Sequence, residues 1–261
     1  EQDDLLGFFP KWVYALLKEK DFEKITILTQ YKGEDFKRSN LEIILLEKEK
    51  NILLRIFSFY KRLFSLRKQY DSVFILMAPS WQIVAGPLLK LLGKKSFLWY
   101  AVWKKTFKLR IALFWADRVI ASVPQAFPIK TNKLEVVGQG IDTDFFRPDE
   151  SKRIKNRILY LGRISPIKKI ENIIKFLTYL KDTEGIEFDI VGGPVNKEDD
   201  SYLKSLERQV ERFNLGDRVY FYGRKPHNEI MPFYQRADIF INLTPTGSFD
   251  KTMLEAMASG C

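Results

Sequence analysis

Short runs rich in β-branched residues alternate with amphipathic stretches along the whole chain, and this alternation most restricts the possible folds. The predicted strands are 24–32, 41–47, 72–79, 95–101, 118–122, 134–140, 157–163, 188–193, 218–224 and 237–244. The stretches with helical period are 8–20, 51–69, 81–93, 105–115, 168–182, 198–214 and 227–236, and a last helix begins near Lys251. Strands that alternate with helices favour parallel βαβ units.

The alternation falls into two series, which are separated by FFRPDESKR at residues 145–153. A proline among mixed charges is typical of a joint between domains. A chain of 261 residues is also long enough for two domains. We therefore predict an α/β protein with two Rossmann-like domains, residues 1–145 and 146–261.

Composition excludes several classes of protein. Apolar residues make up 46% of the chain and charged residues 29%, as in globular proteins. Cys261 is the single cysteine, which rules out a disulfide within the chain and favours a reducing compartment. No apolar run approaches the roughly 18 residues of a membrane span, and the first residues, EQDDLLGFF, are acidic where a signal peptide is basic. We expect a cytoplasmic protein.

The C-terminal half contains two loops suited to a phosphate ligand. In GRISPIKK (162–169), Arg163 and Lys168 follow a predicted buried strand, and ligands bind at the carboxyl edge of such sheets. A guanidinium and an ammonium together suit a diphosphate, although both residues are also explained as solvated loop charges. In VGGP (191–194), Gly192 and Gly193 allow a tight turn and a close approach to a ligand, but such turns are common.

The stretch GSFDKTMLEAMASGC (247–261) predicts a polar loop followed by a helix. Asp250 stands at the N-cap position, and the free N–H groups of a helix start, with the helix dipole, bind anions. Glu255 lies about one turn inside the helix. A carboxylate beside a phosphate suits sugar hydroxyls as its partners; the alternative is an ordinary acidic residue that interacts with the helix dipole.

Together these signals fit a ligand with two phosphates and a ribose, and here the sequence resembles a known family. LGRISPIKK, FDIVGGP, RVYFYGRKPHNEIMPFYQRADIFINLT and LEAMASG resemble the donor-binding domain of retaining glycosyltransferases of family 4, which have the GT-B fold. VVGQGIDTDFFRP (136–148) is similar to the interdomain segment of that family. The resemblance is close over residues 134–261 and loose over 1–133, where GPLLKLLGKKSFLWYA (86–101) carries it. It implies two Rossmann-like domains that face each other across a cleft.

The resemblance also implies roles for individual residues. Arg163 and Lys168 would be catalytic, since they hold the diphosphate of the donor and stabilise the leaving group in place of a metal. Glu255 would bind the ribose, and the amides of the first helical turn would face the phosphates. The residues expected to bind the donor are Gly162, Gly192, Gly193, Asp250, Lys251, Thr252, Met253 and Glu255. No metal is implied, because Arg163 and Lys168 take its part, and no cofactor is implied, because the nucleotide-sugar is a substrate.

The sequence departs from the family where the sugar is handled. Gly247 stands where the family has the first glutamate of its E-x7-E signature, and either Asp250 or the backbone would replace it. Val102 stands where we would expect a histidine of the N-terminal domain. The single histidine, His227, lies in the other half, in a turn where we expect it to be structural or exposed. A relative that binds nucleotide with weak or no transfer is therefore the alternative.

Both ends of the chain also differ from the family pattern. The helix predicted at 8–20 should follow a first strand and a glycine loop, and LEAMASG should be followed by a further buried strand. We therefore expect both domains to be incomplete. Unpaired sheet edges favour aggregation, so we expect this piece of the protein to be poorly soluble or inactive.

The net charge of +10 favours anionic partners. NILLRIFSFYKRLFSLRKQ (51–69) and WKKTFKLR (103–110) make the N-terminal half basic and aromatic. One interpretation is a surface for anionic lipid on the inner face of the membrane, with a lipid-linked or glycan acceptor in cell-envelope polysaccharide biosynthesis. The other is an ordinary helix with a solvated basic face. A basic nucleic-acid-binding protein is a third reading, but no helix-turn-helix, RNA-recognition or zinc signature is present.

Overall fold

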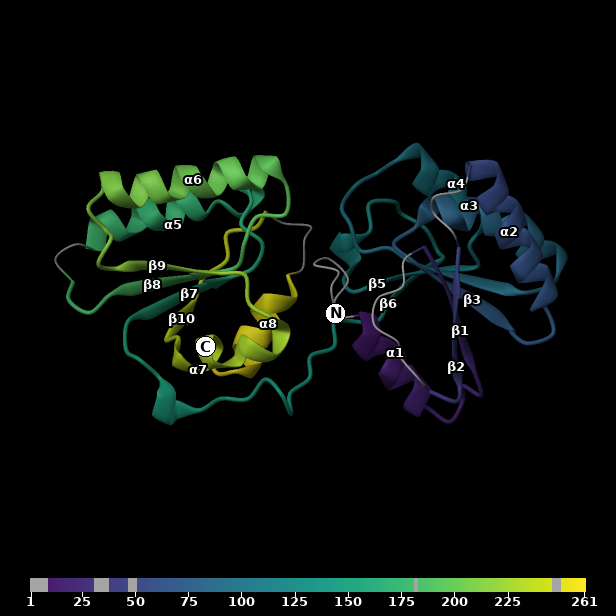
Figure 1. Cartoon of the computed structure of the whole chain (residues 1–261), viewed down its shortest axis with the longest axis horizontal. Helices are drawn as coiled ribbons and strands as arrows, with labels where there is room; N and C mark the ends of the chain where they lie inside the picture. Colours follow the sequence, from purple (N-terminus) through teal and green to yellow (C-terminus); the bar gives the residue numbers. More distant parts are fainter. Residues whose placement is uncertain (1–8, 31–37, 47–50, 181–182, 246–249) are drawn as a thin grey trace. The chain divides into compact units, whose positions relative to one another are not determined.

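Helices alternate with strands throughout the computed structural model, which describes residues 9–30, 38–46, 51–180, 183–245 and 250–261 (Figure 1). By their contacts the residues divide into two units, the first made of residues 1–99 and 106–119 and the second of residues 100–105 and 120–261. The division passes through β5 (Arg118–Ala121). The boundary predicted between residues 145 and 146 stays a prediction.

The part of the chain before residue 137 contains two groups of strands with helices between them. Its elements are α1 (Phe9–Lys18), β1 (Ile25–Thr29), β2 (Leu41–Leu45), α2 (Ile52–Ser65), β3 (Ser72–Leu76), α3 (Pro79–Leu91), β4 (Lys95–Trp99), α4 (Phe107–Trp115), β5 and β6 (Leu134–Val136). β1 pairs with β2 in parallel, and a second sheet has the order β3-β4-β5-β6, in which β3 and β4 are parallel.

Close packing of α3 against α4 explains a glycine inside a helix. A Cβ atom built on Gly86 would overlap the side chain of Trp115, so that only glycine allows this approach of the two helices. α4 begins at an N-cap, Thr106, whose hydroxyl accepts the N–H of Leu109 at 3.1 Å.

None of the helices in the described ranges has both the length and the apolar character that a membrane span requires.

The C-terminal part is a parallel sheet with helices on both faces. Its helices and strands are β7 (Arg157–Leu161), α5 (Ile170–Leu177), β8 (Glu187–Val191), α6 (Lys197–Arg212), β9 (Val219–Gly223), α7 (Met231–Arg236), β10 (Ile239–Phe240) and α8 (Lys251–Ala258). The strand order is β10-β7-β8-β9, and each neighbouring pair is parallel. α5 and α6 cover one face of this sheet, and α7 and α8 lie on the other (Figure 1).

Side chains of β7 alternate between two hydrophobic cores. Ile158 and Tyr160 join the core formed with α5 and α6. Leu159 and Leu161 join the core formed with α7 and α8. Successive residues of a strand point to opposite faces, so a strand buried on both sides reads as the continuous apolar run that the sequence shows here.

Most predicted elements are present, and the differences have local causes. The strand predicted at 188–193 ends at Val191, because Gly192 has a φ of +144° and turns the chain out of the sheet. The helix predicted from residue 168 begins at Ile170, since Lys169 is left-handed with a φ of 52° after the short turn Pro166–Lys168. The strand predicted at 237–244 was too long: β10 has two residues.

Candidate functional site

Most of the predicted donor-binding residues follow the carboxyl ends of β7 and β8 or begin α8. Parallel strands end at a common edge of their sheet, and this edge is the usual ligand site in open α/β sheets. Gly162 and Arg163 follow β7, whereas Gly192 and Gly193 follow β8. All of them belong to the second unit.

The two glycine turns touch each other. A Cβ atom on Gly192 would overlap the carbonyl oxygen of Gly162, and the N–H of Gly192 donates to Gly223 at 2.9 Å. The carbonyl of Gly193 accepts the N–H of Ile164 at 3.1 Å. Glycine at position 192 is therefore required by the packing of two backbone turns, independently of any ligand.

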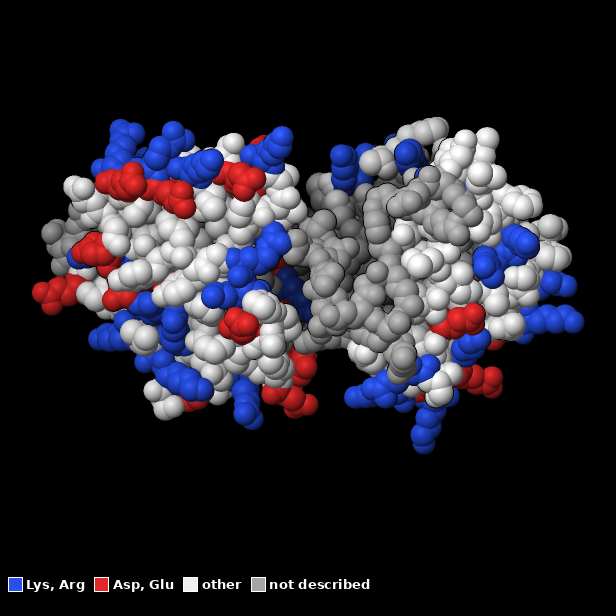
Figure 2. All heavy atoms as spheres, in the orientation of Figure 1, with Lys and Arg blue, Asp and Glu red and all other residues white. Residues whose placement is uncertain are grey.

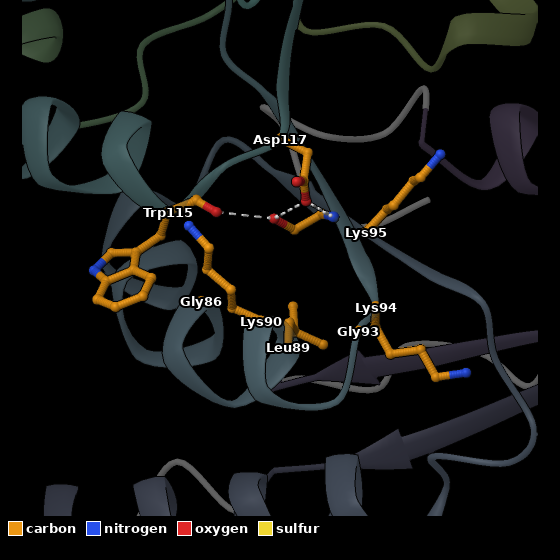
Figure 3. A pocket seen from close by; sticks show the side chains of 9 residues that line it. Gly86, Leu89, Lys90, Gly93, Lys94, Lys95, Trp115 and Asp117 are labelled. Carbon is orange, nitrogen blue, oxygen red and sulfur yellow. Dashed lines mark hydrogen bonds between the residues drawn. The ribbon is translucent and has the colours of Figure 1, made fainter.

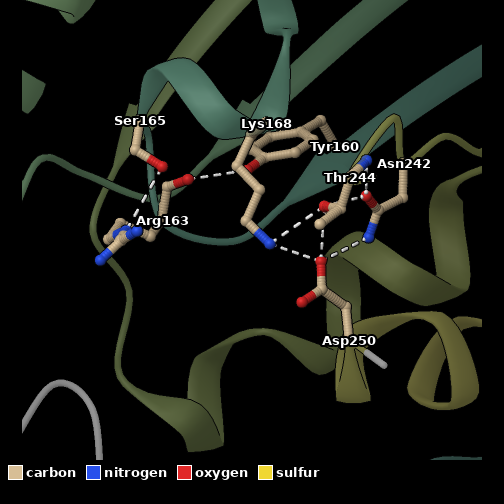
Figure 4. A network of polar contacts seen from close by, with 7 residues as sticks. All are labelled: Tyr160, Arg163, Ser165, Lys168, Asn242, Thr244 and Asp250. Atoms are coloured by element: carbon tan, nitrogen blue, oxygen red, sulfur yellow. Dashed lines mark hydrogen bonds and ion pairs between the residues drawn. The ribbon is translucent and has the colours of Figure 1, made fainter. Parts of the chain in front are cut away.

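Arg163 lies in the loop after β7, and its side chain lies beside Ser165 (Figure 4). Its Nε atom is 3.3 Å from the hydroxyl of Ser165 and 4.0 Å from a carboxylate oxygen of Asp199. The hydroxyl of Tyr160 donates to the carbonyl of Arg163 at 2.7 Å. Burial raises the pKa of Tyr160, so this hydroxyl stays protonated and fixes the loop.

Lys168 sits at the centre of a polar network of side chains (Figure 4). Its ammonium donates to Asp250 at 2.5 Å and to the hydroxyl of Thr244 at 3.1 Å. The same carboxylate oxygen of Asp250 accepts the amide of Asn242 at 2.8 Å and lies 2.8 Å from the Thr244 hydroxyl. The network joins residues from the loops after β7 and β10 to the start of α8.

Asp250 occupies the predicted N-cap position of α8, but its side chain makes no capping hydrogen bond there. The predicted N-cap position is confirmed, but the carboxylate binds within the Lys168 network and does not cap the helix. Lys251, Thr252 and Met253 form the first helical turn as expected. The N–H of Met253 donates to the carbonyl of Asp250 at 3.1 Å, so this amide is used within the turn.

Glu255 is buried, with only 4% of its surface exposed. Its carboxylate accepts the hydroxyl of Tyr234, in α7, at 2.9 Å. Burial and the neighbouring charge of Glu255 both raise the pKa of Tyr234, which keeps the hydroxyl a donor. The carboxylate predicted to bind a ribose thus already has one hydrogen-bond partner from the protein.

Two further predictions concern residues outside this network. Gly247, which replaces the expected glutamate, lies outside the described residues. His227 is exposed, and its ring stacks on Phe145 with centroids 5.5 Å apart, which confirms the expectation of a structural or exposed residue.

Sequence reasoning missed the partners of the predicted residues. Asn242 and Thr244 follow β10. Two polar residues at alternate positions directly after a predicted strand were the feature that could have indicated their part in the site. Tyr234 and Asp199 gave no signal, because their contacts join residues that are far apart in the sequence. Tyr234 is 21 residues from Glu255, and Asp199 approaches Arg163 from the first turn of α6.

A cavity of about 190 Å³ lies in the first unit, away from these residues in the sequence (Figure 3). It is found near the amino ends of β4 and β5, where Lys90 and Asp117 line it. Asp117 accepts the N–H of Ser96 at 2.7 Å, and the ammonium of Lys90 lies 5.7 Å from the ring centre of Phe114. Lys94 and Lys95 also line the cavity, and we assign no ligand to it.

The comparison with known proteins finds a family model that matches the C-terminal half of the chain. The family model described as "Glycosyl transferases group 1" matches residues 142–261. The C-terminal half of the chain is therefore similar to this family. The match covers the whole β10-β7-β8-β9 sheet, α5 to α8 and every predicted site residue of the C-terminal half.

Curated relatives match over the same half of the chain. The chain is 31% identical over 159 residues to alpha-monoglucosyldiacylglycerol synthase of Streptococcus pneumoniae, a match that covers 55% of this chain and 34% of the relative. It is 26% identical over 164 residues to mannosylfructose-phosphate synthase of Agrobacterium fabrum, which covers 55% of this chain and 36% of that one. The chain thus spans about a third of the length of these relatives.

Solved structures establish the GT-B fold. HepE of Anabaena, determined in complex with UDP, is similar over 84% of this chain and 65% of its own, with a TM-score of 0.67 and 18% identity. Sucrose-phosphate synthase of Thermosynechococcus elongatus is similar over 90% of this chain and 69% of its own, with a TM-score of 0.69 and 18% identity. Both are GT-B proteins, and the predicted fold class is confirmed.

Proposed function

We propose that the protein transfers a sugar from a nucleoside-diphosphate sugar to an acceptor, and that its C-terminal unit binds the donor. The observation that carries the proposal is the gathering of Lys168 and the start of α8 at the carboxyl edge of a parallel sheet. The group 1 match over residues 142–261 supports it.

In the proposed reaction the bond between the anomeric carbon and the diphosphate oxygen breaks, and the electron pair leaves with the nucleoside diphosphate. The acceptor hydroxyl gives its proton to the departing diphosphate oxygen and bonds to the same carbon on the same face. Arg163 and Lys168 would stabilise the charge that develops on the leaving diphosphate, which is the part that a metal plays in other transferases. Retention is measured by NMR of the anomeric proton of the product, and metal independence by activity in a chelator.

The remaining predicted residues would hold the nucleotide. Glu255 would accept ribose hydroxyls with the carboxylate that also accepts the hydroxyl of Tyr234. Gly162, Gly192 and Gly193 would allow the nucleotide to approach the backbone closely. The amides of Lys251 and Thr252 would face the phosphates.

Calorimetric titration of UDP, GDP and ADP into the purified chain tests donor binding, and UDP comes first because the HepE structure contains it. Arg163→Ala and Glu255→Gln should each weaken binding by about tenfold or more, since each removes a charged partner of the ligand. Glu255→Gln is chosen because it keeps an oxygen for Tyr234. Arg208→Ala, on the exposed side of α6, is the matched control. A folded chain that binds none of the three would overturn the proposal.

Binding without transfer would instead favour the alternative, a relative with weak or no activity.

A nucleic-acid-binding protein is disfavoured by the distribution of charge. On the face shown in Figure 2, Lys and Arg side chains are scattered among acidic ones over both units and do not form one continuous stripe.

We propose further that the acceptor is lipid-linked and that the first unit contacts an anionic membrane. On α2, Leu53 is 71% exposed and Phe57 is 69% exposed, beside the exposed cations Lys61 and Arg62. Apolar side chains next to cations suit the interface of an anionic bilayer. The name of one relative, a synthase of a glucosyldiacylglycerol, also points to a lipid acceptor.

Sedimentation with vesicles tests the membrane contact. The chain should sediment with vesicles that contain phosphatidylglycerol and much less with pure phosphatidylcholine. Leu53→Ser combined with Phe57→Ser should reduce binding about tenfold or more, given the apolar area removed. Lys204→Glu, on exposed α6, is the control for charge. If the double variant sediments with these vesicles as well as the Lys204→Glu control does, α2 is an ordinary helix with a solvated face.

A further inference from the structure

Each cation predicted to hold the donor diphosphate already faces a carboxylate of the protein. Lys168 is 2.5 Å from Asp250, and Arg163 is 4.0 Å from Asp199. The Lys168 pair is the more enclosed, because the two side chains are only 13% and 18% exposed. The predicted phosphate site is therefore not a simple basic pocket.

Asp250 combines two features that a phosphate would use. Its carboxylate accepts a hydrogen bond from the ammonium of Lys168, and it directly precedes the first turn of α8, where the helix dipole favours an anion. Thr244 and Asn242 hold the same oxygen in place with contacts of 2.8 Å each. The protein thus supplies its own anion at this position.

A diphosphate that approached Lys168 would meet this carboxylate. Two anions that share one ammonium repel each other, and the repulsion is strong where the side chains are mostly shielded from water. Ligand binding then requires that Lys168 exchange its partner, or that Asp250 move away with the loss of its contacts to Thr244 and Asn242.

We propose that Asp250 competes with the donor diphosphate for Lys168 and so limits the affinity of the site. The inference rests on the proposed function and adds a residue that sets its specificity. Weakly bound anions such as free phosphate are rejected, whereas a ligand with further contacts to ribose and base displaces the carboxylate. Arg163 keeps its own, longer contact to Asp199 and is the first cation open to the incoming phosphates.

Titration of UDP into Asp250→Asn tests the competition. Removal of the charge should tighten UDP binding by about tenfold or more, because like charges at close range are costly. In a Lys168→Met background the same substitution should change the affinity by less than about threefold, since the shared ammonium is gone. Glu207→Gln, an exposed acid of α6, controls for the change in net charge. Circular dichroism and thermal unfolding verify that each variant is folded.

The outcomes separate the inference from the proposed function. If unmodified protein binds UDP and Asp250→Asn binds it equally or more weakly, the competition is wrong, and weaker binding would make Asp250 a ligand-binding residue. An equal gain in both Lys168 backgrounds would also overturn it, because the effect would then be general electrostatics. If neither the unmodified protein nor folded Asp250→Asn binds UDP, GDP or ADP, the proposed function fails and the inference fails with it.

Discussion

At the scale of single residues, position 192 requires glycine for its backbone turn, and the proposed ligand site would require a glycine there as well. Gly192→Ala would place a Cβ atom against the carbonyl of Gly162, at a φ of +144° that disfavours side chains. We expect a loss of unfolding free energy of at least about 2 kcal/mol, from overlap and backbone strain together. Urea unfolding measures it. Gly216→Ala is the control, since a Cβ there meets nothing within 4 Å.

Asp250 links stability to pH. Burial alone would raise its pKa, but hydrogen bonds from Asn242 and Lys168 outweigh burial and lower the pKa below the ordinary 3.8. A carboxyl group with a lowered pKa in the folded state adds stability above its unfolded pKa, and this contribution is lost as the pH falls through the folded pKa.

Asp250→Asn should therefore be less stable than the unmodified protein at pH 7, by about 1 kcal/mol, because a charge-assisted hydrogen bond is weakened. The difference should shrink in urea titrations carried out at successively lower pH below 4. A difference that is the same at all pH values would show that the charge of Asp250 is not the cause. The same variant should bind nucleotide more tightly, so stability and affinity would change in opposite directions.

At the scale of elements, a buried ion network joins β7, β8 and α7. Asp189 is fully buried in β8 and accepts the Nε atoms of Arg157 and Arg236, each at 3.0 Å. Asp189→Asn would leave two partly buried guanidinium groups without this charge, which we expect to cost about 3 kcal/mol of unfolding free energy. Chemical denaturation measures the loss, with Glu207→Gln on α6 as the control. A loss below about 0.5 kcal/mol would show that the contacts of Asp189 with Arg157 and Arg236 contribute no net stability.

Element order could be predicted from the sequence because each strand is an apolar run and each helix an amphipathic one. Ile158 to Leu161 are buried on both faces, so the run that predicts β7 also reports its position inside the sheet. The ends of elements were harder. β10 stops at Phe240 where an extension to residue 244 was expected, because Asn242 and Thr244 bond to each other and to Asp250 through their side chains.

At the scale of the whole molecule, the sequence predicts which residues gather and fails to predict their partners. Arg163 and Gly192 were predicted to lie at one sheet edge because parallel strands end together. Lys168 and Asp250 are 82 residues apart, and nothing in either local sequence indicates that they pair. For the same reason the burial of Glu255 against Tyr234 was not foreseen. Long-range pairing depends on the packing of helices, which composition and period do not encode.

The position of the domain boundary is the remaining question at this scale. Phe146 is 2% exposed and belongs to the core of Leu159, Tyr234 and Ala256. The N–H of Phe146 donates to the carbonyl of Asp142 at 2.8 Å. Ile141 and Phe145 also pack against this core, so it includes residues on both sides of the predicted boundary between residues 145 and 146.

A comparison of two C-terminal pieces tests whether Phe146 and the turn before it belong to the C-terminal domain. A piece of residues 139–261 retains Phe146 and its turn, whereas a piece of residues 147–261 loses them. The shorter piece should be less stable by about 3 kcal/mol or more, as for removal of a buried phenylalanine, and this is a large fraction of the stability of a domain. Urea unfolding of both pieces measures the difference. Equal stability would place the boundary after Phe146, because its ring would then add nothing to the C-terminal core.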